Sequence, residues 1–120
     1  MITKNILKHK HLLIAVSYTI WLTAISLMPT DNNKPLPFDN ADKVIHFFLY
    51  FFLVIVWLKV FSEFNQQKIV ILFLIILWGI MIEIIQDKFI PGRTGDFLDA
   101  LANSIGGITA FFIFHKFLKK

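Results

Sequence analysis

The sequence contains no cysteine among its 120 residues. This absence excludes disulfide bonds, a thiol nucleophile and thiolate metal ligands. Also missing are a glycine-rich phosphate loop, the Gly-x-Ser-x-Gly elbow of hydrolases and a dinucleotide-binding signature. Acidic residues are few, eight against twelve Lys and Arg. Because the basic residues stand at the ends of apolar runs, they are typical of membrane topology signals, and we expect no nucleic-acid partner.

Apolar residues are abundant, at 57% of the chain, and the mean hydropathy of +0.69 is well above that of a soluble domain. They form four runs, at residues 12–28, 42–61, 69–86 and 98–114. The runs are too long for strands and lack the alternation that a transmembrane barrel needs. We therefore predict an all-α, polytopic membrane protein with four transmembrane helices and the lipid bilayer as its surroundings. The predicted domain covers 12–114, between basic tails at 1–11 and 115–120.

The first apolar run has an alternative interpretation as a signal peptide, because a basic segment precedes it. The run is long for the apolar region of a signal peptide. Met28-Pro29 follows it without a small-x-small cleavage site. A retained membrane helix is therefore expected.

The distribution of Lys and Arg predicts the orientation of the helices. The two tails and the turn at 62–68 with its flank hold eight cations and one acid, Glu63. The loops on the other side hold four cations and seven acids. If the basic side is cytoplasmic, both termini lie in the cytoplasm.

Polar residues from three distant segments would then meet at the extracytoplasmic face. Asp42, His46 and Tyr50 are four residues apart and share a helix face, as do Asp99 and Asn103. The full set is Asp42, Lys43, His46 and Tyr50 in the second helix, Glu83 and Gln86 in the third, and Arg93, Asp96, Asp99 and Asn103 at the start of the fourth.

Each of these residues has a functional and a structural interpretation. His46 is suited to acid/base chemistry if a carboxylate orients it, or it is an interfacial residue in a capped helix start. Glu83, flanked by isoleucines, must face protein, be neutralised or contact water. Arg93 suits an anionic headgroup, or it pairs with Glu83 or Asp99. The small residues Ala102, Gly106 and Ala110 indicate a helix-packing ridge.

A metal site is a further possibility, because His46 could combine with the carboxylates of Asp42, Glu83, Asp96 or Asp99. No pair of these residues has a diagnostic ligand spacing. The prediction from sequence therefore includes no metal and no cofactor.

Three motifs together resemble the VanZ-like family of small bacterial membrane proteins: Asp42-Lys43-x-x-His46-Phe47-x-x-Tyr50, Glu83-x-x-Gln86 and Pro91-Gly92-Arg93-x-x-Asp96-x-x-Asp99-x-x-x-Asn103-x-x-Gly106. The resemblance covers residues 42–110, although Ala110 stands where a further glycine is expected. It implies a multi-pass protein of the bacterial inner membrane and cell envelope. The founding member is linked to low-level resistance to the antibiotic teicoplanin. The resemblance supplies no reaction.

The preferred hypothesis is an outward-facing polar pocket that binds or modifies an anionic lipid headgroup or cell-wall precursor. In it, Lys43 and Arg93 contact the anion, and His46, Glu83 and Asp99 are acid/base candidates. The remaining binding candidates are Asp42, Tyr50, Gln86, Asp96 and Asn103, of which Gln86 and Asn103 orient the acid/base groups. The alternatives are an intramembrane hydrolase or transferase with Glu83 and His46 as acid and base, a self-satisfied structural network, and, less favoured for so few helices, a proton-coupled transporter. The sequence leaves enzymatic activity and oligomeric state open.

Overall fold

Four long helices make up nearly all of the computed structural model, which describes residues 2–28, 41–62, 65–90 and 97–118. They are α1 (Ile2–Leu27), α2 (Ala41–Val60), α3 (Asn65–Phe89) and α4 (Phe97–Ile113), and a π-helical turn, η1 (Phe114–Leu118), continues α4. No strand occurs in the described ranges. The predicted all-α fold class is confirmed.

Every helix contains a stretch that is long and apolar enough to cross a membrane. These stretches are His9–Leu27, Ala41–Val60, Gln67–Phe89 and Phe97–Phe117. The prediction of four transmembrane helices is therefore confirmed. The helices also extend beyond the apolar runs: α1 includes most of the basic segment 1–11, because a helix satisfies its own backbone hydrogen bonds whether or not its side chains enter lipid.

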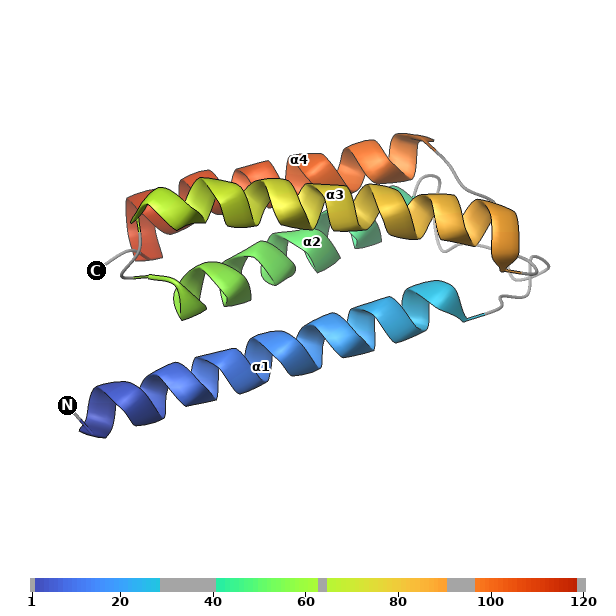
Figure 1. The fold of residues 1–120 in the computed structure, drawn as a ribbon. Coiled ribbons are helices and arrows are strands. Elements are labelled where there is room, and N and C mark those ends of the chain that lie inside the picture. Colours follow the sequence, from blue (N-terminus) through green and yellow to red (C-terminus); the bar gives the residue numbers. More distant parts are fainter. Residues whose placement is uncertain (1, 29–40, 63–64, 91–96, 119–120) are drawn as a thin grey trace.

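The helices run alternately up and down an elongated bundle with extents of 52 × 24 × 24 Å. The first turn of α1 and the η1 turn lie at one end (Figure 1). The last turns of α1 and α3 and the first turns of α2 and α4 lie at the other end (Figure 1). Residues far apart in the sequence are therefore brought to the same depth at that second end, which we call the polar end.

α2 and α4 form the closest helix pair, and a glycine makes their approach possible. A Cβ on Gly106 would overlap the backbone carbonyl of Phe47 and lie 3.1 Å from the Phe47 Cα. Gly106 and Ala110 are buried at this interface, as expected for a ridge of small residues, while Ala102 is half-buried. Small residues let helix backbones approach in lipid, where no hydrophobic effect drives helix association.

α1 lies on the outside of the other three helices (Figure 1). Few of its side chains are buried, Ala15 and Leu22 among them. Hydrogen bonds to α2 and α3 also hold it in place. They include Tyr18 O–H to the Leu49 carbonyl at 2.7 Å, Trp57 Nε1–H to Thr19 Oγ1 at 2.8 Å, and Trp78 Nε1–H to Thr23 Oγ1 at 3.3 Å. Such interhelical bonds contribute roughly 0.6–2 kcal/mol each in membranes.

We expect Gly106→Ala to destabilise the bundle, because a methyl group that meets backbone can be accommodated only if α2 and α4 separate. Overpacking of this kind costs roughly 1–3 kcal/mol. The melting temperature of the purified protein in detergent measures the effect. Gly107→Ala is the matched control, because its Cβ would meet a side-chain methyl of Val54 at 3.2 Å and no backbone atom closer than that. Equal melting temperatures for the two variants would contradict this account of the helix crossing.

Candidate functional site

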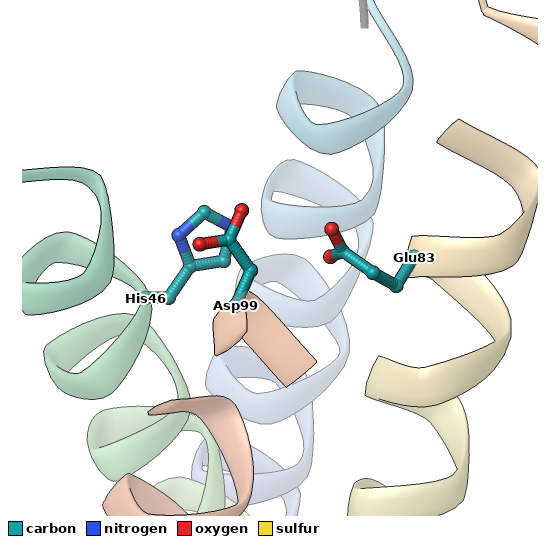
Figure 2. Close-up of side chains that lie close together, drawn as sticks. All are labelled: His46, Glu83 and Asp99. Atoms are coloured by element: carbon teal, nitrogen blue, oxygen red, sulfur yellow. The ribbon is translucent and has the colours of Figure 1, made fainter. Parts of the chain in front are cut away.

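Three helices bring ionisable side chains together near the polar end. His46 comes from α2, Glu83 from α3 and Asp99 from α4. One nitrogen or oxygen atom from each lies within 4.8 Å of the others. Figure 2 shows the imidazole beside the Asp99 carboxylate, with the Glu83 carboxylate extending toward both. We call these three residues the triad.

The antiparallel order of the helices explains why the triad residues meet. Asp99 is in the first turn of α4, and His46 is five residues after Ala41, where α2 begins. Glu83 is six residues before Phe89, where α3 ends. At 1.5 Å per residue, all three lie within about 9 Å of the helix ends.

The two carboxylates of the triad are buried. Glu83 is 7% exposed and Asp99 8% exposed. An ionised group in this position costs several kcal/mol unless partners compensate it. Lys43 supplies a partner for Asp99, with Nζ 3.2 Å from Asp99 Oδ1 and 3.0 Å from Asp42 Oδ2. One ammonium group thus links the starts of α2 and α4.

His46 is oriented by the backbone. Its Nδ1 lies 2.6 Å from the carbonyl oxygen of Asp42, one turn earlier in α2. A carbonyl oxygen only accepts hydrogen bonds, so Nδ1 carries a proton, and in the neutral imidazole Nε2 has the lone pair. The sequence analysis expected a carboxylate in this role. The carbonyl of Asp42 performs it instead, while the Asp42 carboxylate pairs with Lys43.

A second polar layer lies one helical turn deeper in the bundle. Tyr50 follows His46 by four residues and Asn103 follows Asp99 by four, so each shares a helix face with a triad residue. Both are buried, at 2% and 4% exposed. Gly79, one turn before Glu83, leaves room for them: a Cβ there would lie 3.0 Å from the Tyr50 ring and 3.4 Å from Asn103 Nδ2. Asn103 Oδ1 has no hydrogen-bond partner among the described residues.

Gln86 ties the polar end to α1. Its Nε2 donates a 2.6 Å hydrogen bond to the backbone carbonyl of Ser26. The sequence predicts that Gln86 orients the acid/base groups, whereas its hydrogen bond in the structure goes to α1. Ser26 cannot be identified from the sequence as the partner, because any residue at that position offers the same carbonyl.

Arg93 and Asp96 lie outside the described residues, so their predicted contacts stay predictions. The other predicted site residues fall into one region: Asp42, Lys43, His46, Glu83 and Asp99 in the first layer, Tyr50 and Asn103 in the second, and Gln86 beside α1.

Two grooves reach this region from either side of α4. One, of about 340 Å³, is lined by Lys43, Val44, Phe47, Phe48, Ala102 and Ile105 and lies between α2 and α4. The other, of about 270 Å³, lies between α3 and α4, and Glu83, Asp87, Lys88 and Phe97 are among its lining residues. Lys43 and Glu83 are therefore accessible from the surface of the bundle by different routes.

A buried cation lies at the opposite end of the bundle. Lys68 is 0% exposed, and its Nζ is 5.4 Å from the ring centroid of Phe114, within range of a cation–π interaction. The sequence analysis placed Lys68 in a polar turn. The structure places it in the first turn of α3, where it packs against the end of α4.

The arrangement can do two kinds of chemistry. An imidazole with a free Nε2 next to two carboxylates can accept and return a proton. The same nitrogen and carboxylate oxygens are donors that divalent metals accept.

Comparison with known proteins places the chain in a family. The family model described as VanZ/LLP1 matches residues 3–119, nearly the whole chain. No curated protein and no solved structure gives a significant match.

Proposed function

The chain belongs to the VanZ/LLP1 family, and we propose that its polar end binds or modifies an anionic component of the bacterial cell envelope. The ligand would be a lipid headgroup or a cell-wall precursor. The protein itself is a multi-pass membrane protein by its family and its four apolar helices. Its membrane, in this proposal, is the bacterial cytoplasmic membrane.

The orientation is part of the proposal. The end opposite the polar end carries Lys59, Lys68 and Lys116, together with the basic first turns of α1. By the rule that loops rich in Lys and Arg stay inside, this end faces the cytoplasm and both termini are cytoplasmic. The triad would then open toward the outer surface of the membrane.

The groove that contains Lys43 is the observation that carries the proposal. Lys43 stands at its edge, with its ammonium paired to Asp42 and Asp99. The wall of the groove is apolar and is formed by Val44, Phe47, Phe48, Ala102 and Ile105. A cation above an apolar wall matches a molecule with an anionic head and a hydrocarbon chain. The Lys43 side chain is 22% exposed while it pairs with Asp99.

The remaining site residues have roles in this proposal. Arg93, four residues before α4, would be a second cation for the anion. His46, Glu83 and Asp99 would exchange protons with the ligand if it is modified. Asn103 would orient the ligand or a bound water through its free amide oxygen.

An intramembrane hydrolase or transferase is the second candidate, favoured by the lone pair on His46 Nε2 beside two carboxylates. Such an enzyme needs a nucleophile. Ser104 is a poor one, because its hydroxyl donates a hydrogen bond to the Ala100 carbonyl within α4. Water activated by His46 or Glu83 is the better choice.

We expect Lys43→Ala to bind anionic lipid more weakly than the wild type. Native mass spectrometry of the purified protein with phosphatidylglycerol, and with phosphatidylcholine for comparison, measures the difference. Loss of one cation near a headgroup corresponds to about 1 kcal/mol, or about fivefold in affinity. Lys43→Arg should retain most of the binding. Lys59→Ala, at the other end of the bundle, shows how much binding is lost when a cation away from the site is removed. Unchanged selectivity for phosphatidylglycerol in Lys43→Ala would refute this role.

We expect alanine at His46, Glu83, Arg93 or Asp99 to abolish any effect of the protein on teicoplanin susceptibility or on sensitivity to envelope stress. The measurement is teicoplanin susceptibility, followed by sensitivity to envelope stress, in bacteria that hold each variant at equal membrane level. Thr109→Ala is the control, because this exposed hydroxyl only bonds within α4. If all four variants behave like the wild type, the polar end serves a structural role and the proposed function fails.

The orientation can be tested cleanly because the chain has no cysteine. We expect Lys34→Cys to react with a membrane-impermeant thiol reagent in intact cells. Ser62→Cys, in the turn after α2, should react only after lysis. The reverse pattern would place the triad on the cytoplasmic side and remove the basis for an extracytoplasmic ligand.

A further inference from the structure

The triad has the composition of a metal site. It combines a half-buried imidazole with two buried carboxylates, from three different helices. The same three side chains converge in Figure 2. In a tetrahedral site with bonds of about 2.1 Å, the ligand atoms lie about 3.4 Å apart. The observed separations are all within 4.8 Å, so the side chains would have to close in by up to about 1.4 Å around an ion.

The triad side chains accept and donate the supporting hydrogen bonds that are typical of metal ligands. A metal-bound histidine commonly donates its other ring N–H to a carbonyl or carboxylate, which fixes the tautomer. His46 does this through Nδ1 and the Asp42 carbonyl, which leaves Nε2 for the ion. Bound carboxylates are in turn usually hydrogen-bonded. Asp99 has this support on Oδ1 from Lys43.

Asn103 provides an independent observation. It is 4% exposed, and its Oδ1 has no hydrogen-bond partner in the described part of the chain. It shares the face of α4 that presents Asp99, one turn deeper, and so it faces the same interior space. Buried amide oxygens without a partner are uncommon and indicate a water or ion at the site. A water bound to a metal at the triad would donate to this oxygen.

The charge of the region points to a cation. Among the residues that the structure describes, the first layer contains the carboxylates of Asp42, Glu83 and Asp99 and the ammonium of Lys43, in a protein that crosses a low-dielectric medium. A divalent ion between Glu83 and Asp99 would reduce the repulsion between two buried carboxylates. The groove between α3 and α4, which Glu83 lines, gives such an ion a path from the surface.

We propose that His46 Nε2 and the carboxylates of Glu83 and Asp99 bind one divalent transition-metal ion. A donor set of one imidazole and two carboxylates suits Zn²⁺ or Mn²⁺. The sequence offers His46, Glu83 and Asp99 as possible ligands but predicts no metal, because no pair of them has a diagnostic spacing along the chain. Three protein ligands leave coordination positions for water or for an anion. The link to an anion rests on the proposed function, whereas the metal site does not.

The experiment measures metal binding by the full chain in detergent, after removal of any polyhistidine tag and treatment with a chelator. Isothermal titration with Zn²⁺ and with Mn²⁺, and elemental analysis after desalting, give the affinity and the stoichiometry. We expect one ion per chain for the wild type and a higher melting temperature in its presence. A stoichiometry near zero for both metals would overturn the proposal.

Variants of the ligands identify the site. His46→Ala, Glu83→Gln and Asp99→Asn should each weaken binding by roughly 100-fold or more, since even loss of a supporting residue costs 10- to 100-fold. His115→Ala is the control, because His115 lies in η1 at the other end, bonded to the Phe111 carbonyl. Melting temperatures in chelator show which variants fold. Folded variants that bind metal as tightly as the wild type would also overturn the proposal.

The result separates this inference from the proposed function. If phosphatidylglycerol binds through Lys43 and no metal binds, only the metal site is wrong. If metal binds at the triad and no anionic lipid or precursor binds, the proposed function is wrong and the metal site stands.

Discussion

The close contact between Gly106 and the backbone of Phe47 fixes the site, because it sets the register of α2 against α4. Phe47 directly follows His46, and Gly106 is two turns after Asp99 on the same helix face. A contact between backbones has no flexible side chain that could absorb a shift. Once these two helices are seated, His46, Lys43 and Asp99 have little freedom to separate, and α3 need only bring Glu83 to them.

The membrane makes this register matter energetically. A carboxylate that loses its partner inside a bilayer has no bulk water to return to, so misalignment of α2 and α4 costs far more than in a soluble bundle. Lys43 joins acids on both helices, at 3.0 and 3.2 Å, and so favours the same register as Gly106. Packing and electrostatics thus favour the same register of α2 against α4, and such consistency favours a single well-defined native state.

Hydrogen bonds also determine where α1 lies. Tyr18 bonds to α2, and Ser26 accepts a bond from Gln86 of α3, although much of the α1 surface faces outward. In lipid an apolar helix face gives little guidance, because the hydrocarbon solvates it as well as protein does. Polar contacts therefore determine which face of α1 packs against the other helices. A groove of about 330 Å³ lined by Thr19, Trp57 and Trp78, among others, remains between α1, α2 and α3.

The sequence by itself determined the fold class, the four helices and the set of polar residues at one depth. Length and apolar character alone decide whether a segment can cross a bilayer, and reversal of the chain at each turn places Asp42, Glu83 and Asp99 at the same end. Only the tertiary structure decided which of those groups meet. In the folded protein, Gln86 bonds to Ser26, His46 bonds to the carbonyl of Asp42, and Lys68 is buried against Phe114. These outcomes depend on the rotation of each helix about its axis, and that rotation is set by contacts such as Gly106 with Phe47, which no single segment of the sequence contains.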